Sequence, residues 1–222
     1  MSKKIISVVI VLVTVGLLSN AYPRRRGRIS LESAISKGRG RFLLRNESAS
    51  IPSMPKTIDE FINLRKEIGK TPKGAAVLFI IAMATFVKNK DLGTNFFTLV
   101  LDRYYISRYC RRIAKFKGYC PNRRAMYFIN RLHSKKYLPG IYVRDTTVNN
   151  AYKFSTPATI TFNQATIINR RRLKLYINTT SGNRARPLGM KKSNNGYWKA
   201  NNFSSFFIGG SREPKNEQPD DL

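Results

Sequence analysis

The chain has 222 residues, with 41 lysines and arginines against 12 acidic residues, so its formal net charge at neutral pH is +29. Two cysteines and one histidine are too few to hold a structural zinc ion, which takes four ligands. The sequence has no G-x-S-x-G elbow, no pair of zinc-peptidase histidines and no glycine-rich phosphate loop after a strand. The composition therefore disfavours the common hydrolase and nucleotide-binding classes, and we expect no metal, cofactor or catalytic residue.

Residues 1–21 have the pattern of a secretory signal peptide. Lys3 and Lys4 precede an uncharged apolar run over residues 5–18, and Ser19 and Ala21 place small residues before a cleavage site. A membrane-spanning helix needs about 20 apolar residues, which disfavours the alternative of a retained anchor. We therefore expect cleavage after Ala21 and export to the periplasm, the cell envelope or the medium.

Residues 22–54 are rich in arginine, glycine and serine and include the runs PRRRGR and KGRGR. Such a composition buries too little apolar surface to fold by itself, so we expect a flexible basic linker, with one or two helical turns at a short periodic patch over residues 29–35. Ordered structure is expected to begin at residue 55.

Residues 55–144 carry helical patterns. Thr57 begins a capping box ahead of an amphipathic helix. Thr71 then precedes a second helix, whose residues 74–87 are apolar on every side and predict a buried central helix. One long or two short helices are expected over residues 94–116, and a further helix follows in PNRRAMYFINRLHS.

Residues 145–214 change to the alternating pattern of strands. The alternation occurs in ATITF and LKLYI, and Asn195 and Gly196 suit the positive φ angles of a tight hairpin turn. Further strands are expected on both sides of that turn, with Trp198 in the core of the sheet. We thus predict an α+β fold, an N-terminal helical half packed with a small C-terminal antiparallel β-sheet, and an acidic tail over residues 215–222.

Cys110 and Cys120 are the only cysteines in the chain. Thiols are oxidised outside the cytoplasm, so a disulfide between them is the leading interpretation for an exported protein. A metal site lacks ligands, and a catalytic thiol would need a base, for which His133 is the sole histidine.

Two long stretches of the chain contain no acidic residue. Residues 103–144 include 12 basic residues and residues 146–212 include 11. Such a charge field attracts polyanions, and we predict binding of an anionic polymer or an anionic membrane surface. The candidate cations are Arg108, Arg111, Arg112, Lys115, Lys117, Arg123, Arg124, Arg170, Arg171 and Arg172.

Aromatic residues are interleaved with the first group of cations. This composition fits a base-stacking groove, and it equally fits a helix with an aromatic core face and arginines that reach past it to solvent. We favour the second, because export removes the usual reason to bind nucleic acid. The aromatic residues are Tyr104, Tyr105, Tyr109, Phe116, Tyr119, Tyr127 and Phe128.

Four blocks of the chain carry a family resemblance: TIDEFINLRKEIGKTPKGAAVLFIIAMA, KGYCPNRRAMYFINRL, NNAYKFSTPATI and LKLYINTTSGNRARPLGMKKSNNGYWKANNFSSFFIGGSREP. In these blocks, over residues 51–214, the chain resembles a bacterial family of exported proteins known only as a domain of unknown function. The resemblance implies no activity, cofactor or catalytic residue. The cysteine pair and the strong positive charge lie outside its pattern, so polyanion binding would belong to this protein and not to its family.

Two other classes of function remain open. The protein could be a structural or protein-interaction module that holds one partner of the cell envelope. It could also be an enzyme with an unrecognised site, which would require Asp102, Asp145, His133 and Arg186 to converge on one pocket.

Overall fold

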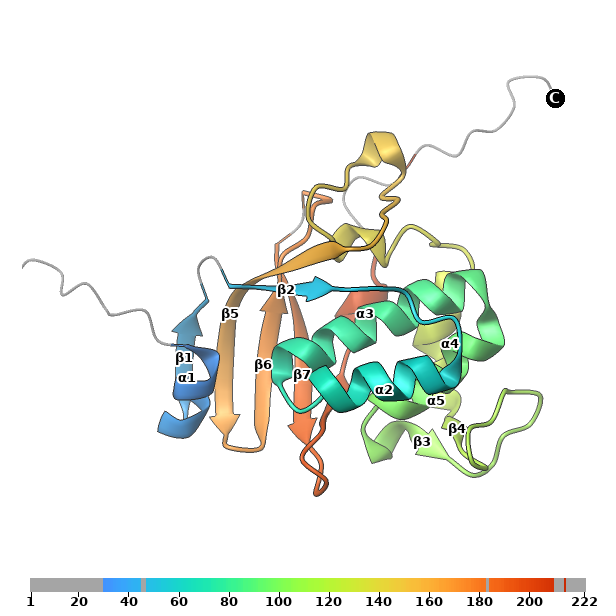
Figure 1. The fold of residues 1–222 in the computed structure, drawn as a ribbon, viewed down its shortest axis with the longest axis horizontal. Helices are drawn as coiled ribbons and strands as arrows, with labels where there is room; N and C mark the ends of the chain where they lie inside the picture. The colour runs from blue at the N-terminus through green and yellow to red at the C-terminus, as the bar shows by residue number, and fades with distance from the viewer. Residues whose placement is uncertain (1–29, 45–46, 183, 210–213, 215–222) are drawn as a thin grey trace, which may run out of the picture.

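The structure, a computed structural model, describes residues 30–44, 47–182, 184–209 and 214. The predicted signal peptide and the predicted acidic tail lie outside the described residues. Within the described ranges the fold combines five α-helices, a six-stranded antiparallel sheet and a two-stranded ribbon (Figure 1). The helices are α1 (Leu31–Lys37), α2 (Ile58–Ile68), α3 (Pro72–Lys88), α4 (Lys90–Val100) and α5 (Arg123–Ile129). The strands are β1 (Gly40–Leu43), β2 (Ser48–Ile51), β3 (Ile106–Ser107), β4 (Cys120–Pro121), β5 (Ala158–Asn169), β6 (Arg172–Ile177), β7 (Arg186–Lys192) and β8 (Trp198–Asn202).

The large sheet is organised around β5, its longest strand. Its order is β1-β5-β6-β7-β8, and β2 also pairs with β5, nearer the N-terminal start of that strand than β1. In the middle of the sheet, Leu175 of β6 lies opposite both Ala165 of β5 and Leu188 of β7, and all three are buried. The hairpin between β7 and β8 turns at Gly196, whose φ of 81° confirms the predicted tight turn, and Trp198 is buried as expected.

The prediction of a small sheet confined to the C-terminal half is wrong. The sheet has six strands, and two of them come from residues 40–51, ahead of the helices α2 to α5. Helical turns are also not confined to the N-terminal half, because 3-10 helices occur at Val148–Asn150 and Ser204–Phe207. The error has a physical cause: the strands GRFL and SASI have little hydrophobic alternation of their own and are held by backbone hydrogen bonds to β5, more than 100 residues away.

The described part of the segment 22–54 forms a helix and two strands, so the prediction of a flexible linker is wrong there. Helix α1 begins at its cap Ser30, whose side chain accepts a hydrogen bond from the backbone N–H of Ser33. Leu31 and Ala34 of this helix are buried in the core. Figure 1 shows α1 beside β1, at the edge of the sheet.

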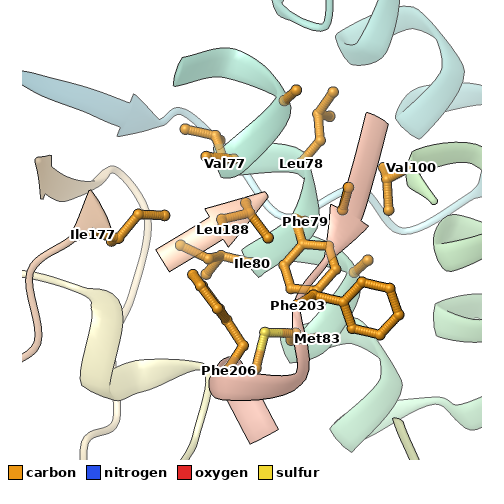
Figure 2. Close-up of a cluster of buried hydrophobic side chains, with 14 of the residues drawn as sticks. Val77, Leu78, Phe79, Ile80, Met83, Val100, Ile177, Leu188, Phe203 and Phe206 are labelled. Atoms are coloured by element: carbon orange, nitrogen blue, oxygen red, sulfur yellow. The ribbon is translucent and has the colours of Figure 1, made fainter. Parts of the chain in front are cut away.

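Helix α3 is the centre of the core, as its all-round apolar sequence predicted. Thr71 caps it by accepting a hydrogen bond from the N–H of Gly74, and all its residues from Gly74 to Phe86 are buried. Phe79 packs against rings of α4 and of the 3-10 helix after β8, with centroids 5.7 Å from Phe97 and 5.5 Å from Phe206 (Figure 2). No helix in the described ranges has the length and apolar composition needed to cross a bilayer.

The helix expected over residues 94–116 ends early, at Val100. Beyond it the backbone is extended at Leu101, and the N–H of Asp102 donates to the carbonyl oxygen of Ala200 on β8. A short 3-10 helix (Arg103–Tyr105), the ribbon of β3 and β4, and a long loop follow in place of a helix. The docking of this segment on the sheet therefore overrides its local helical pattern.

Candidate polyanion-binding surface

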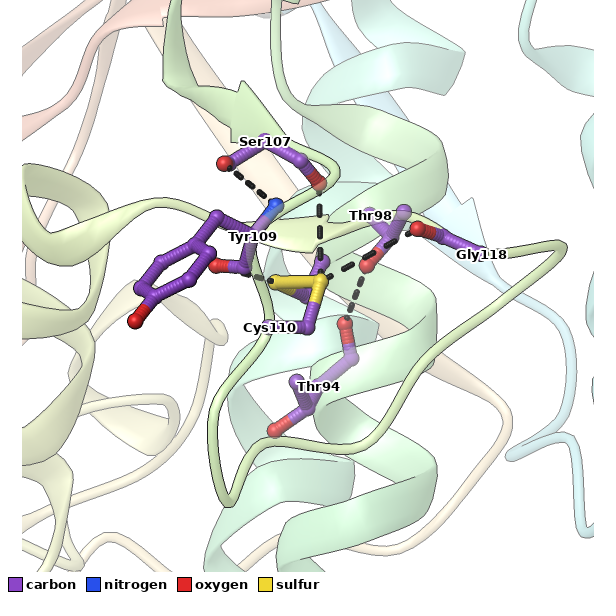
Figure 3. The surroundings of a disulfide bond; sticks show 7 residues. Thr94, Thr98, Ser107, Tyr109, Cys110 and Gly118 are labelled. Carbon is purple, nitrogen blue, oxygen red and sulfur yellow. Dashed lines mark hydrogen bonds between the residues drawn. A yellow bond between two sulfur atoms is a disulfide. The ribbon is translucent and has the colours of Figure 1, made fainter.

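Cys110 and Cys120 form a disulfide, as predicted, with their Cα atoms 5.9 Å apart (Figure 3). At the base of the loop, Ser107 of β3 pairs with Cys120 of β4. Both cysteines are buried, and Figure 3 shows them next to Thr94 and Thr98 of helix α4. The bond therefore ties the two ends of residues 110–120 to each other. We call this segment the clasped loop.

The clasped loop presents basic side chains to solvent. Arg111, Arg112, Lys115 and Lys117 are all exposed. Arg112 and Lys117 have φ angles of 57° and 50°, which mark tight turns of the loop backbone. Within the described part of the chain, the side chains of Arg111, Arg112 and Lys115 make no ion pair and no hydrogen bond. Their charges are therefore available to an external anion.

Arginines stacked on tyrosines surround the base of this loop. Arg108 donates to the hydroxyl of Tyr119 at 2.7 Å, and its guanidinium lies 5.1 Å from the ring centroid. Arg124, at the start of α5, makes the same pair with Tyr104, with a hydrogen bond of 2.7 Å. Such contacts orient a guanidinium while leaving part of it open to solvent.

The aromatic residues of this region divide into two groups. Tyr105 is buried, and the half-buried Phe128 packs against the core, as an aromatic core face requires. Four tyrosines are instead exposed, which the favoured interpretation did not expect. They are Tyr104 (62%), Tyr109 (80%), Tyr119 (36%) and Tyr127 (63%). Together with the clasped loop, Arg108, Arg123 and Arg124, these tyrosines form what we call the tyrosine–arginine surface.

The other three predicted cations lie elsewhere. Arg170 and Arg171 form the turn between β5 and β6, and Arg172 begins β6; Figure 1 places this turn well apart from the β3–β4 ribbon. There they line a hollow of about 610 Å³ with Lys191 and the amides Asn169 and Asn194. The structure thus divides the ten candidate cations into two separate clusters.

Arg171 is fixed by hydrogen bonds within the second cluster. Its guanidinium donates to Asn194 Oδ1 at 2.6 Å and to the carbonyl oxygen of Lys192 at 3.3 Å, both beside the β7–β8 turn. One acid lies near this hollow, because Lys191 Nζ is 3.8 Å from a carboxylate oxygen of Asp102. No cation of the tyrosine–arginine surface forms an ion pair within the described residues, and its acidic neighbour Asp102 accepts a hydrogen bond from the backbone N–H of Tyr104. The tyrosine–arginine surface is therefore the stronger candidate for a polyanion.

The four residues that an enzyme would need to bring together do not converge. Asp102 lies near Lys191, and Asp145 forms an exposed ion pair with Arg144. Arg186 donates to the carbonyl oxygens of Ser205 and Gly209. Across the residues that the structure describes, no group of three histidine, cysteine or acidic side chains is placed to hold a metal ion.

Lys199 is a half-buried titratable group that the sequence did not single out. It lies on β8, and its Nζ donates to the carbonyl oxygen of Leu99 at the end of α4. The pKa of Lys199 is lowered to about 7, chiefly by desolvation and also by the nearby guanidinium of Arg65, while Asp102 partly opposes this shift. In a sequence, a lysine on a strand with alternating hydrophobicity is interpreted as a solvent-facing residue. The contact between β8 and α4 is what shields Lys199 from water.

This lysine should make the stability of the protein depend on pH. In the unfolded chain it keeps its proton up to a pH of about 10.5, whereas in the folded protein it loses the proton above about 7. The unfolded state therefore binds more protons in this range, so the free energy of unfolding should rise with pH, by at most about 1.4 kcal/mol per pH unit. Urea denaturation at pH 7 to 9 measures the slope, which Lys199→Met should flatten. Lys174→Met, at an exposed position of β6, should leave it unchanged; a slope equal in parent and Lys199→Met would contradict the prediction.

The chain belongs to the family described as Domain of unknown function (DUF6935), whose model matches residues 53–215. No curated protein matches the chain, and no solved structure does. The family match begins after β2, so α1, β1 and β2 precede it although the two strands complete the sheet. The clasped loop and both cationic clusters lie within the matched residues.

Proposed function

We propose that this protein is an exported, non-enzymatic protein of the bacterial cell envelope that binds an anionic polymer or an anionic membrane surface through its tyrosine–arginine surface. The observation that carries the proposal is the clasped loop, which holds four exposed cations without an acidic partner in the described chain. Export is supported by the signal-peptide pattern of residues 1–21 and by the disulfide, since such bonds persist in oxidising compartments.

The electrostatic term should dominate this binding. A protein that neutralises phosphates or similar groups releases condensed counterions, so the affinity falls steeply as salt rises. Because the loop is closed by a disulfide, its cations are held together on a short, constrained segment. Less conformational entropy is then lost on binding than for an open loop of the same composition.

The tyrosines add a contact that does not depend on charge alone. Their rings are flat and have few rotamers, and the hydroxyls of Tyr104 and Tyr119 are already engaged by arginines. Exposed tyrosines beside arginines also suit sugar rings or the interfacial region of a lipid bilayer. The sequence-independent chemistry fits a polymer or a surface better than a unique partner.

The test compares the parent protein with a variant in which Arg111, Arg112, Lys115 and Lys117 are all changed to Gln. We expect salt-sensitive binding of the parent to heparin, duplex DNA and anionic vesicles. For duplex DNA the slope of log affinity against log salt should be smaller by about 3 to 4 in the loop variant, because each phosphate contact contributes about 0.9. Titrations between about 50 and 200 mM salt measure this slope.

A matched control removes the same charge elsewhere. The four exposed lysines Lys37, Lys56, Lys70 and Lys90 are changed to Gln, and the slope should change by less than about 1. Equal reductions of the salt slope in the two variants would show that binding depends on net charge and not on a defined surface. Weak and salt-independent binding of the parent to all three probes would contradict the proposal itself.

A second candidate function is recognition of one envelope protein with an acidic surface. The observation that favours it is Tyr109, which immediately precedes the clasped loop and is 80% exposed, because tyrosine and arginine are enriched at protein interfaces. Capture of one partner that survives washing at about 0.5 M salt would favour this candidate over a polymer, since exposed ionic contacts are screened there.

A further inference from the structure

A cavity of about 1150 Å³ lies apart from both cationic clusters, and none of the ten candidate cations lines it. Most of its walls come from three separate segments, and Met54 and Pro214 complete the lining. The three segments are the end of helix α3 at Ala84, Val87 and Lys88, the segment 133–140, and the segment 151–156. The volume is slightly above the range of about 300 to 1,000 Å³ that is usual for small-molecule sites.

The lining of this cavity combines an apolar floor with a basic rim. Ala84, Val87, Met54, Pro139 and Phe154 supply apolar surface. The rim carries three exposed lysines and one histidine, and among the described residues no aspartate or glutamate lines the cavity. The rim cations are Lys88, Lys136, Lys153 and His133.

The wall formed by residues 151–156 is held in an uncommon backbone conformation. Ala151 and Tyr152 have φ angles of 51° and 54°, and two successive non-glycine residues rarely adopt this left-handed region. Gly140 makes the conformation possible by close approach: a Cβ atom there would lie 1.8 Å from the carbonyl oxygen of Tyr152. Such conformations persist where the surrounding structure enforces them, and they gather at binding sites.

Ring contacts add to the definition of the walls. The imidazole of His133 lies 5.2 Å from the ring of Phe86 on α3, and the rings of Tyr137 and Tyr152 lie 5.8 Å apart. These contacts join the segment 133–140 to both of its neighbours. The cavity is therefore largely formed before any ligand enters.

We propose that this cavity binds a small organic anion with an apolar body, of the class of a medium-chain carboxylate. The apolar floor buries the chain, and the lysines of the rim face the carboxylate. A purely inorganic anion leaves the floor unused, and a neutral chain leaves the rim unpaired. The site uses none of the residues of the tyrosine–arginine surface, so the proposal of a carboxylate site is independent of the proposed polymer-binding function.

Isothermal titration calorimetry of the purified protein with decanoate, below its micelle concentration, tests the proposal. Decanoate should bind at one site, at least tenfold more tightly than either 1-decanol, which lacks the charge, or acetate, which lacks the chain. Changing Lys88, Lys136 and Lys153 together to Gln should weaken decanoate binding at least tenfold. These lysines are exposed, so the variant should fold, and a melting curve checks this.

Two further variants locate the binding. Lys115→Gln/Lys117→Gln, on the clasped loop, should leave the affinity for decanoate unchanged. Val87→Trp places a larger side chain in the cavity and should weaken binding at least tenfold. Equal affinity of the parent and the triple variant for decanoate, equal affinity of the parent for decanoate and 1-decanol, or undiminished binding by Val87→Trp would each overturn the proposal.

Discussion

Phe79→Ala is expected to lower the free energy of unfolding by about 3 to 5 kcal/mol, the range for removing a buried phenylalanine ring. Phe79 is fully buried at the middle of α3. Its ring meets Phe97 of α4 and, after β8, the rings of Phe203, Phe206 and Phe207. One truncation therefore leaves a cavity where α3, α4 and the end of the sheet meet. Urea denaturation followed by far-ultraviolet circular dichroism measures the loss.

Two matched variants separate this packing effect from a general aromatic one. Phe79→Leu keeps much of the volume and should cost about 1.5 kcal/mol or less. Tyr127→Ala removes a similar ring from a side chain that is 63% exposed and should stay within about 0.5 kcal/mol of the parent. A loss below about 1 kcal/mol for Phe79→Ala would mean that α3 is not the centre of the core.

Removal of the disulfide is expected to have the second largest effect. Cys110→Ala/Cys120→Ala should lower the free energy of unfolding by about 3 kcal/mol, because a loop of about 11 residues then gains conformational freedom in the unfolded chain. It should also weaken binding to heparin, since the cations of the clasped loop lose their shared position. Thermal melts and heparin affinity measure the two effects.

A reductant provides the control for this variant. It should lower the melting temperature of the parent toward that of the double alanine variant and leave the variant itself unchanged. Alanine is chosen because Cys120 is fully buried, and a serine would introduce a hydroxyl there. Identical melting of the parent with and without reductant would argue against a stabilising bond.

Local sequence patterns predicted several elements correctly. Helix α3 could be predicted because a helix that is apolar on all sides must be buried. Its start could be predicted because Thr71 is a typical N-cap residue and Pro72 is typical of the first helical position. The turn at Gly196 could be predicted because few residues accept a positive φ. In each case the relevant interaction lies within a few residues along the chain, or depends only on hydrophobicity.

Long-range pairing explains most of what was missed. The strands β1 and β2 have no strong strand pattern in their sequences. They form because their backbones pair with the edge of β5. The end of α4 at Val100 likewise follows from the hydrogen bond between Asp102 and Ala200, which no local pattern reveals. The same holds for Lys199, whose burial depends on the neighbouring end of α4.

The candidate site was predictable in its chemistry but not in its geometry. The ten cations and the cysteine pair could be read from composition and spacing. Their separation into two clusters, and the exposure of Tyr104 and Tyr109, came from the fold. The lysine-rimmed cavity had no sequence signal at all, because most of its walls come from three separate segments of the chain.

The sequence by itself determined the positive charge field, the cysteine pair, the buried helix α3 and the family resemblance, since charge, hydrophobic pattern and local motifs are properties of neighbouring residues. Only the tertiary structure decided the extent of the sheet, the position of the clasped loop, the pKa of Lys199 and the place of the cavity. These features depend on which distant segments meet, and desolvation and close packing arise only where they do.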